Sequence, residues 1–131
     1  MISGIGIDIV HVDRITRWLS IPGLVDRFFH PEEIEAASRR GAGKALSLAA
    51  RLAAKEAFGK ALGTGLSGLK LKDIQVRNDH NGKPWIVLQE TARRKFDSAG
   101  GGMIHCSLTH EGENAVAMVL IETTDDGHGR N

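Results

Sequence analysis

The chain is poor in cysteine, balanced in charge and free of long apolar runs. Cys106 is the single cysteine among 131 residues, so no internal disulfide can form, and its apolar neighbours favour a buried thiol. Basic residues number 17 against 16 acidic ones, a formal net charge of +1 without a basic run, which gives no support for nucleic-acid binding. No apolar stretch reaches the roughly 18–20 residues that cross a bilayer, and segment 1–8 lacks the features of a signal peptide. We expect a cytoplasmic protein without a membrane span.

The chain has the length of a single domain, and its sequence patterns predict several helices and strands. Hydrophobic residues make up 41% and charged residues 25%, ordinary values for a folded domain. The patterns predict helices at 13–19, 24–29, 31–40, 44–62 and 91–99, and strands at 5–9, 74–76, 85–88, 103–108 and 115–121. The last strand is apolar on both faces, which favours a central position. Mostly hairpin-connected strands predict an α+β fold over a parallel doubly wound one, as a single domain at 1–122 with a disordered polar tail at 123–131.

The alanine-rich helix at 44–62 is the most informative segment. At 100° per residue, Glu56 lies beside Ala49 and Leu52 on a small apolar stripe, where an unpaired carboxylate is costly. An exposed i,i+4 pair with Lys60, which contributes only about 0.3–0.5 kcal/mol, is one interpretation. A metal ion is the other. Alanine at every fourth position also predicts a ridge on which another element packs closely.

The strand at 5–9 alternates isoleucine with Gly4, Gly6 and Asp8, and the two glycines predict open space around Asp8. Alone, Asp8 is an aspartate that caps the next helix. Together with Glu56 it forms the kind of carboxylate pair that Mg²⁺ takes up, with water and phosphate oxygens completing the coordination. The G-x-G-x-x-G pattern at 63–68 does not indicate dinucleotide binding, because it follows a helix instead of opening one after a strand.

Four motifs carry a family resemblance. They are GIGIDIV at 4–10, RLAAKEAFGKALGTG at 51–65, NGKP at 81–84 and SLTH at 107–110. Over about residues 2–122 the chain resembles the holo-acyl-carrier-protein synthases, the small bacterial branch of the 4′-phosphopantetheinyl transferases. The resemblance implies a mostly antiparallel sheet packed on a long helix. It also implies transfer of 4′-phosphopantetheine from coenzyme A to a serine of apo-acyl carrier protein, for fatty acid biosynthesis, with release of adenosine 3′,5′-bisphosphate.

The resemblance also implies residue roles. Asp8 and Glu56 would hold Mg²⁺ on the coenzyme A pyrophosphate, and Glu56 would accept the serine proton, directly or through a water. The residues expected to contact coenzyme A or its phosphates are Lys55, Lys60, Gly63, Thr64, Gly65, His110, Gly82 and Pro84. For Gly82 and Pro84 a simple hairpin turn is an equal alternative. For His105 a structural histidine on an inward-facing strand is favoured.

Partners follow from the same resemblance. Arg14 and Arg27 match positions that meet the acidic carrier protein, although solvated arginines are the default interpretation for each. A homotrimer is implied, in which some coenzyme A contacts come from a neighbouring subunit. His30 stands where relatives have Thr or Ser, which predicts a weaker cap for the helix that follows. Two other functions remain open: a non-catalytic module that binds coenzyme A or carrier protein, and a Mg²⁺-dependent nucleotide pyrophosphatase.

Overall fold

The computed structural model describes residues 1–123, so most of the predicted tail lies outside the described residues. The helices are α1 (Val12–Leu19), α2 (Leu24–Phe28), α3 (Pro31–Ser38), α4 (Lys44–Leu62) and α5 (Glu90–Ser98). The strands are β1 (Ile2–His11), β2 (Ile74–Asn78), β3 (Pro84–Leu88), β4 (Met103–Glu111) and β5 (Asn114–Glu122). Short 3₁₀ turns, η1 (Gly41–Gly43) and η2 (Leu71–Asp73), precede α4 and β2. Each predicted helix and strand is present, which confirms the α+β prediction.

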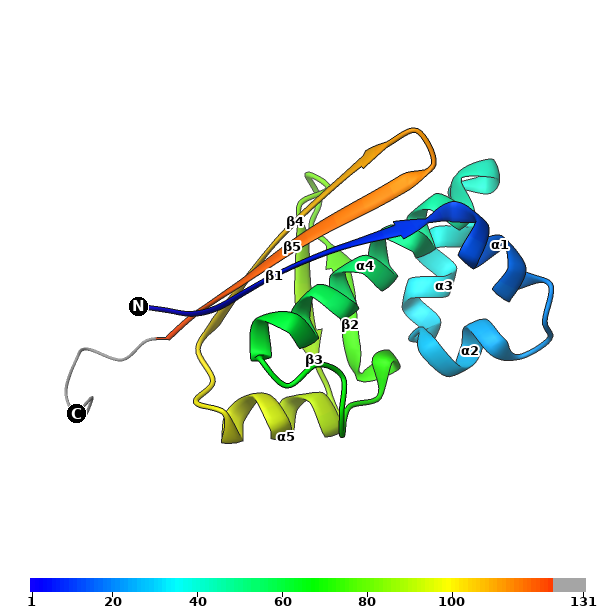
Figure 1. The fold of residues 1–131 in the computed structure, drawn as a ribbon. Helices are drawn as coiled ribbons and strands as arrows, with labels where there is room; N and C mark the ends of the chain where they lie inside the picture. Colours follow the sequence, from blue (N-terminus) through cyan, green and yellow to red (C-terminus); the bar gives the residue numbers. More distant parts are fainter. Residues whose placement is uncertain (124–131) are drawn as a thin grey trace.

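The strands form two antiparallel units around α4. One is a three-stranded sheet in the order β1-β5-β4, and the other is the β2-β3 hairpin. β5 is therefore the middle strand, as predicted from its apolar faces. Figure 1 shows the long strands crossing α4 on one side, with α1, α2 and α3 gathered at one end. The hydrophobic core lies between α4 and these strands.

β1 lies backbone to backbone on α4. A Cβ added to Gly6 would lie 2.0 Å from the carbonyl oxygen of Ala57, and one added to Gly4 would lie 1.8 Å from that of Ala61. The alanine ridge therefore receives another element closely, as predicted. The prediction of open space around Asp8 is wrong, because the α4 backbone occupies the space that the two glycines leave.

We expect Gly6→Ala to destabilise the fold at the upper end of the range for overpacking, about 1–3 kcal/mol, because the methyl group meets backbone atoms that cannot rotate away. Urea unfolding followed by circular dichroism measures the change. Gly43→Ala is the matched control: its nearest contact would be 3.5 Å away, on a side chain, so a cost below about 1 kcal/mol is expected. Equal losses in both variants would contradict the close packing of β1 on α4.

The outer face of the three-stranded sheet is apolar over β1 and β5. Ile5, Ile7 and Ile9 are 61%, 60% and 59% exposed, and the strand register places them opposite Leu120, Met118 and Val116. On β4 the same face carries the polar residues His105, Ser107 and Thr109. In the described chain nothing covers this apolar face.

β4 corrects the prediction for His105. This histidine faces outward, about half exposed, and its Nε2 lies 3.0 Å from Oε1 of Glu122. The inward side chains of β4 are those of Ile104, Cys106 and Leu108, which pack against the core. Cys106 is partly buried, less than predicted, and this burial raises the pKa of its thiol to about 11, so the group stays protonated at neutral pH.

Among residues 1–123, no helix combines the length and the apolar character needed to pass through a membrane.

Candidate active site

Asp8 and Glu56 meet where β1 crosses α4. Asp8 is on the inner face of β1, and Glu56 is on the side of α4 that faces the strand. Burial, the hydrogen bond with Asp8 and the charge of Asp8 together raise the pKa of Glu56 to about 7. Burial alone would also raise the pKa of Asp8, but hydrogen bonds from Glu56 and Lys60 hold it below its usual value. The sequence-based pairing of these two carboxyl groups is thus present in the fold.

Each carboxyl group has its own cation. Nζ of Lys60 lies 2.9 Å from Oδ1 of Asp8 and also donates to the carbonyl of Ile7 at 3.0 Å. Nη2 of Arg14 lies 3.2 Å from Oε1 of Glu56. The simple i,i+4 pair between Glu56 and Lys60 is therefore wrong: Lys60 reaches across to the strand, and Glu56 is held by α1.

The carboxyl pair suits a hard divalent cation. Oδ2 of Asp8 is buried and has no hydrogen-bond partner among residues 1–123. An unpartnered buried carboxylate oxygen is costly. Two carboxylates, one with a free oxygen, at a partly open surface are a fitting donor set for Mg²⁺, which uses one or two carboxylates and completes its shell with other oxygens.

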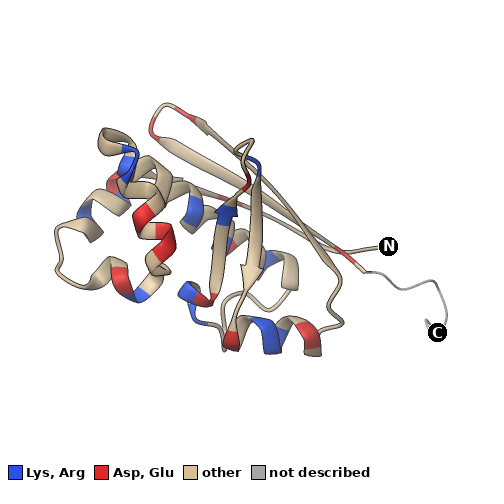
Figure 2. Ribbon diagram, turned by 180° about the vertical axis from the view of Figure 1, so that it is seen from behind, with Lys and Arg blue, Asp and Glu red and all other residues tan. Residues whose placement is uncertain are grey.

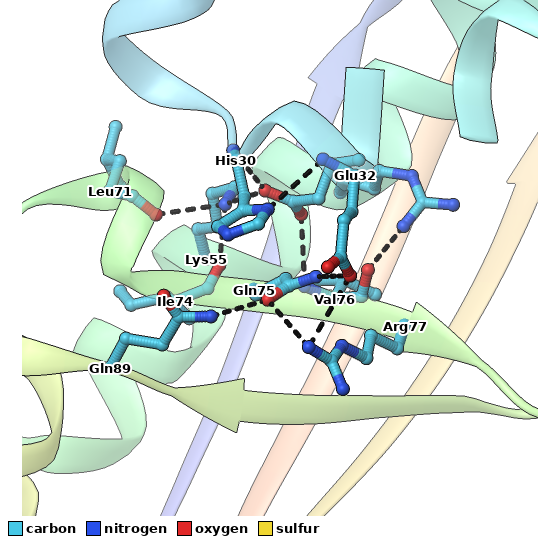
Figure 3. Close-up of polar contacts among 11 residues, drawn as sticks. His30, Glu32, Lys55, Leu71, Ile74, Gln75, Val76, Arg77 and Gln89 are labelled. Atoms are coloured by element: carbon cyan, nitrogen blue, oxygen red, sulfur yellow. Dashed lines mark hydrogen bonds and ion pairs between the residues drawn. The ribbon is translucent and has the colours of Figure 1, made fainter. Parts of the chain in front are cut away.

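Lys55 does not belong to this site. Its side chain is fully buried, and Nζ donates to Oε1 of Glu33 at 2.7 Å and to the carbonyls of Leu71 and Ile74 at 2.9 and 2.5 Å (Figure 3). Burial lowers the pKa of Lys55, and the charge of Glu33 opposes that shift. The prediction that Lys55 contacts a phosphate is wrong, because all three of its donors are used inside the protein.

Glu33 connects three elements around Lys55. Its Oε1 also accepts the N–H of His30 at 2.9 Å, and its Oε2 accepts the N–H of Val76 on β2 at 3.0 Å. Nδ1 of His30 accepts the N–H of Glu32 at 3.1 Å, so a complete capping box starts α3 and the predicted weaker cap is not seen. The Glu33–Lys55 pair fixes how α4 is rotated against α3 and β2, and so the direction in which Glu56 points.

A polar chain extends this network outward over β2. Nε2 of Gln75 donates to Oε2 of Glu32 at 2.9 Å, and Nε2 of Gln89 donates to Oε1 of Gln75 at 2.6 Å. Nη2 of Arg77 lies 3.4 Å from Oε2 of Glu32. Figure 2 shows the acidic positions of α3 beside the basic position of β2. These contacts hold α3 on the hairpin.

A cleft of about 380 Å³ lies between the start of α4, the β2-β3 turn and the end of β4. Three predicted residues, Gly82, Pro84 and His110, line it together. Its other polar lining residues are Arg40, Ser47, Arg51, Asn78 and Thr109. Asp8, Glu56 and Lys60 do not line this cleft, so within one chain the predicted site is divided into two groups.

Arg51 is a cleft residue to which sequence reasoning gave no role. Its Nη1 donates to the carbonyl of Val76 at 2.5 Å and its Nη2 to Oδ1 of Asn78 at 3.1 Å, whereas Nε is buried without a partner in the described part of the chain. The signal was present: Arg51 precedes Lys55 by four residues, so both cations lie on the same face of an alanine-rich helix. Arg40, also missed, gave no such periodic signal.

The glycine turn after α4 uses its own N–H groups. Gly63, at φ +84°, ends the helix and donates to the carbonyl of Lys60 at 3.0 Å, and Gly65 donates to that of Gly59 at 3.0 Å. These two N–H groups are therefore used inside the turn and are not free to bind a phosphate. That Gly63, Thr64 and Gly65 pass close to the substrate stays a prediction.

The arginines predicted to dock a partner lie on α1, which contacts Glu56 through Arg14, and on α2, which packs against α1. The guanidinium of Arg14 on α1 stacks over Trp18, 5.2 Å from the ring centroid. That of Arg27 on α2 lies 5.9 Å from the centroid of Phe28. Trp18 and Phe28 contact each other with centroids 4.9 Å apart, so the two arginines rest on one aromatic pair.

Comparisons with known proteins identify the family and the fold of the chain. A model of the 4′-phosphopantetheinyl transferase superfamily matches residues 4–119. The chain is 54% identical to the holo-acyl-carrier-protein synthase of Treponema denticola, over 93% of this chain and 99% of that protein. It resembles the crystal structure of the Neisseria meningitidis synthase with a TM-score of 0.85 and 32% identity, covering 94% and 100% of the two chains. The Bacillus anthracis synthase in complex with CoA (3′,5′-ADP) has a TM-score of 0.78 and 36% identity, with 95% and 99% covered.

Proposed function

The chain belongs to the 4′-phosphopantetheinyl transferase superfamily, among the holo-acyl-carrier-protein synthases, and we propose that it performs the transfer with Mg²⁺ at Asp8 and Glu56. The observation that carries the proposal is the carboxyl pair, with one buried unpartnered oxygen, placed between Lys60 and Arg14. A non-catalytic binding module has no need for such a costly arrangement at the reacting phosphate.

The residues of this pair have separate tasks. Asp8 and Glu56 would hold the Mg²⁺, which when bound supplies charge neutralisation at the coenzyme A pyrophosphate. Lys60, half exposed next to Asp8, offers its ammonium to a phosphate oxygen. Glu56 accepts the proton of the attacking serine hydroxyl, directly or through an intervening water, and the water route is favoured because a bound cation lowers the pKa of Glu56.

We propose that the cleft lined by Gly82, Pro84 and His110 receives the nucleotide end of coenzyme A. Arg40 and Arg51 supply the positive charge that a phosphate needs there. Since the cleft is separate from the carboxyl pair, a homotrimer would complete the site with a neighbouring subunit's cleft. The exposed isoleucine face of β1 is the kind of apolar surface that a subunit interface covers. Light scattering during gel filtration tests the trimer.

We propose that the second substrate is apo-acyl carrier protein of fatty acid biosynthesis, docking at Arg14 and Arg27. Intact-mass spectrometry of apo-carrier protein with this protein, coenzyme A and Mg²⁺, with and without EDTA, tests the reaction. A mass gain of one phosphopantetheine group that chelation abolishes is expected. No gain with intact coenzyme A would favour a binding module, and cleaved coenzyme A with unmodified carrier would favour a pyrophosphatase.

Metal affinity should depend on pH through Glu56. Its pKa of about 7 is above the ordinary value, so below pH 7 a proton competes with the metal for this carboxyl group. We expect Mn²⁺, measured by electron paramagnetic resonance, to bind more tightly at pH 8 than at pH 6. Below the pKa of Glu56, the affinity for Mn²⁺ should fall by about one order of magnitude for each pH unit. Equal affinities at the two pH values would show that Glu56 does not hold the metal.

A further inference from the structure

Arg14 forms an ion pair with Glu56, one of the two carboxylates proposed to hold the metal. Its Nη2 lies 3.2 Å from Oε1 of Glu56, and among the described residues no other hydrogen-bond acceptor contacts this guanidinium. Its side chain is 41% exposed, whereas that of Glu56 is only 21% exposed. Arg14 thus places a positive charge against the carboxylate that would hold the metal, and it does so from α1, one of the two helices with predicted docking residues.

We propose that Arg14 is a latch that couples metal occupancy to docking of an acidic partner: it neutralises Glu56 in the metal-free site and is released toward the partner when a divalent cation takes Glu56. This inference rests on the proposed function, because it requires the metal site and an acidic carrier protein. It adds that the two ligands cooperate through a single side chain.

The competition follows from charge and from the number of acceptors. A divalent cation at Glu56 repels the guanidinium and competes with it for the charge of the same carboxylate, so each contact weakens the other. Lys60 is in a different position, because it keeps the carbonyl of Ile7 as an acceptor when Asp8 binds the metal. Arg14 has no such second acceptor among residues 1–123, and stacking on Trp18 keeps it at the surface, pointing its freed donors outward.

Cooperation between the two ligands then has a fixed sign. An acidic partner that binds Arg14 removes the competitor of the metal, and the metal removes the competitor of the partner. Thermodynamic linkage requires both factors to be equal. Removing a partly exposed ion pair such as Arg14–Glu56 should change the affinity for either ligand by about two- to fivefold.

Mn²⁺ binding without any substrate tests the latch. Mn²⁺ prefers the same oxygen ligands as Mg²⁺ and is detected by electron paramagnetic resonance. We expect Arg14→Gln to tighten Mn²⁺ binding about two- to fivefold. Arg17→Gln removes a positive charge from the same helix and controls for general electrostatics, so its effect should be clearly smaller. A residue with a purely structural role would weaken metal binding when replaced, not strengthen it.

Titration calorimetry with apo-carrier protein tests the docking half. The wild type should bind carrier more tightly with Mn²⁺ than without it, and Arg14→Gln should lose this difference. Unchanged or weaker Mn²⁺ binding in Arg14→Gln, in a variant whose circular dichroism is native, would overturn the latch. Arg14→Ala also removes the charge, and it replaces Arg14→Gln with the same expected result if that variant fails to fold. The mass-spectrometry assay separates the two failures, since transfer without coupling overturns the latch alone.

Discussion

Glu56→Gln is expected to lower kcat/KM for phosphopantetheine transfer by about 10³-fold, within the usual range for loss of a catalytic acid or base. Gln has nearly the same shape but neither accepts the serine proton nor offers an anionic ligand to the metal. Release of adenosine 3′,5′-bisphosphate, followed by chromatography, measures the rate. Mn²⁺ binding should weaken in parallel, because the metal loses one of two carboxylates.

The fold should survive this replacement. The pKa of Glu56 is raised, so its contribution to stability is present below about pH 4.5 and is lost as the pH rises through 7. At pH 8 the ionised Glu56 therefore costs stability, and the uncharged Gln should leave the melting temperature unchanged or higher. Glu35→Gln, at an exposed i,i+4 pair with Arg39, is the control and should keep full activity. Activity within tenfold of wild type in Glu56→Gln would remove Glu56 from the mechanism.

Lys55→Met is expected to destabilise the protein by about 3–5 kcal/mol, because it leaves Glu33 as an uncompensated charge in the interior. It also removes donors from the carbonyls of Leu71 and Ile74. Urea unfolding measures the loss. The result would separate the two lysines of the motif, since Lys60 replacement should affect catalysis and leave stability nearly unchanged.

A double-mutant cycle isolates the buried pair. Glu33→Gln with Lys55→Met should cost less than the sum of the single replacements, because the double variant removes both charges of the pair and leaves neither uncompensated. The exposed pair Arg39–Glu35 is the matched control and should show coupling below about 1 kcal/mol. Additive effects of Glu33→Gln and Lys55→Met would mean that the 2.7 Å contact in the interior carries no coupling.

The elements were predictable because their signals are local. Alanine spacing, Pro31 at the start of α3 and the glycine after Leu62 gave bounds close to those observed. The element against which β1 packs could not be predicted, because the residues next to β1 in the sequence do not reveal it. Alternation of isoleucine and glycine predicts two different faces, but it does not say which is inside. The glycine face is inside here, because only glycine lets the strand backbone touch α4.

The residues of the candidate site also differ in how far the sequence could predict their contacts. Asp8 and Glu56 could be paired from sequence, because a carboxylate on an apolar stripe needs a partner wherever the fold provides one. The destination of Lys55 could not be predicted: the helical wheel places it away from Glu56, but α3, which supplies Glu33, is separated from it in sequence. The cleft residues gave still less warning, since Arg40, Asn78 and His110 come from three separate segments.

The strand order also determines when the site can form during translation. β5 is the middle strand, yet it is the last described element to leave the ribosome, and it alone pairs with β1. Contacts between residues so far apart in sequence form slowly. A nascent chain that has reached β4 thus carries Asp8 and Glu56, but β1 still lacks its hydrogen-bonded neighbour and presents unpaired backbone beside three isoleucines. Such a chain exposes an unpaired strand edge and apolar side chains, which favour aggregation, until Ala117 arrives opposite Asp8.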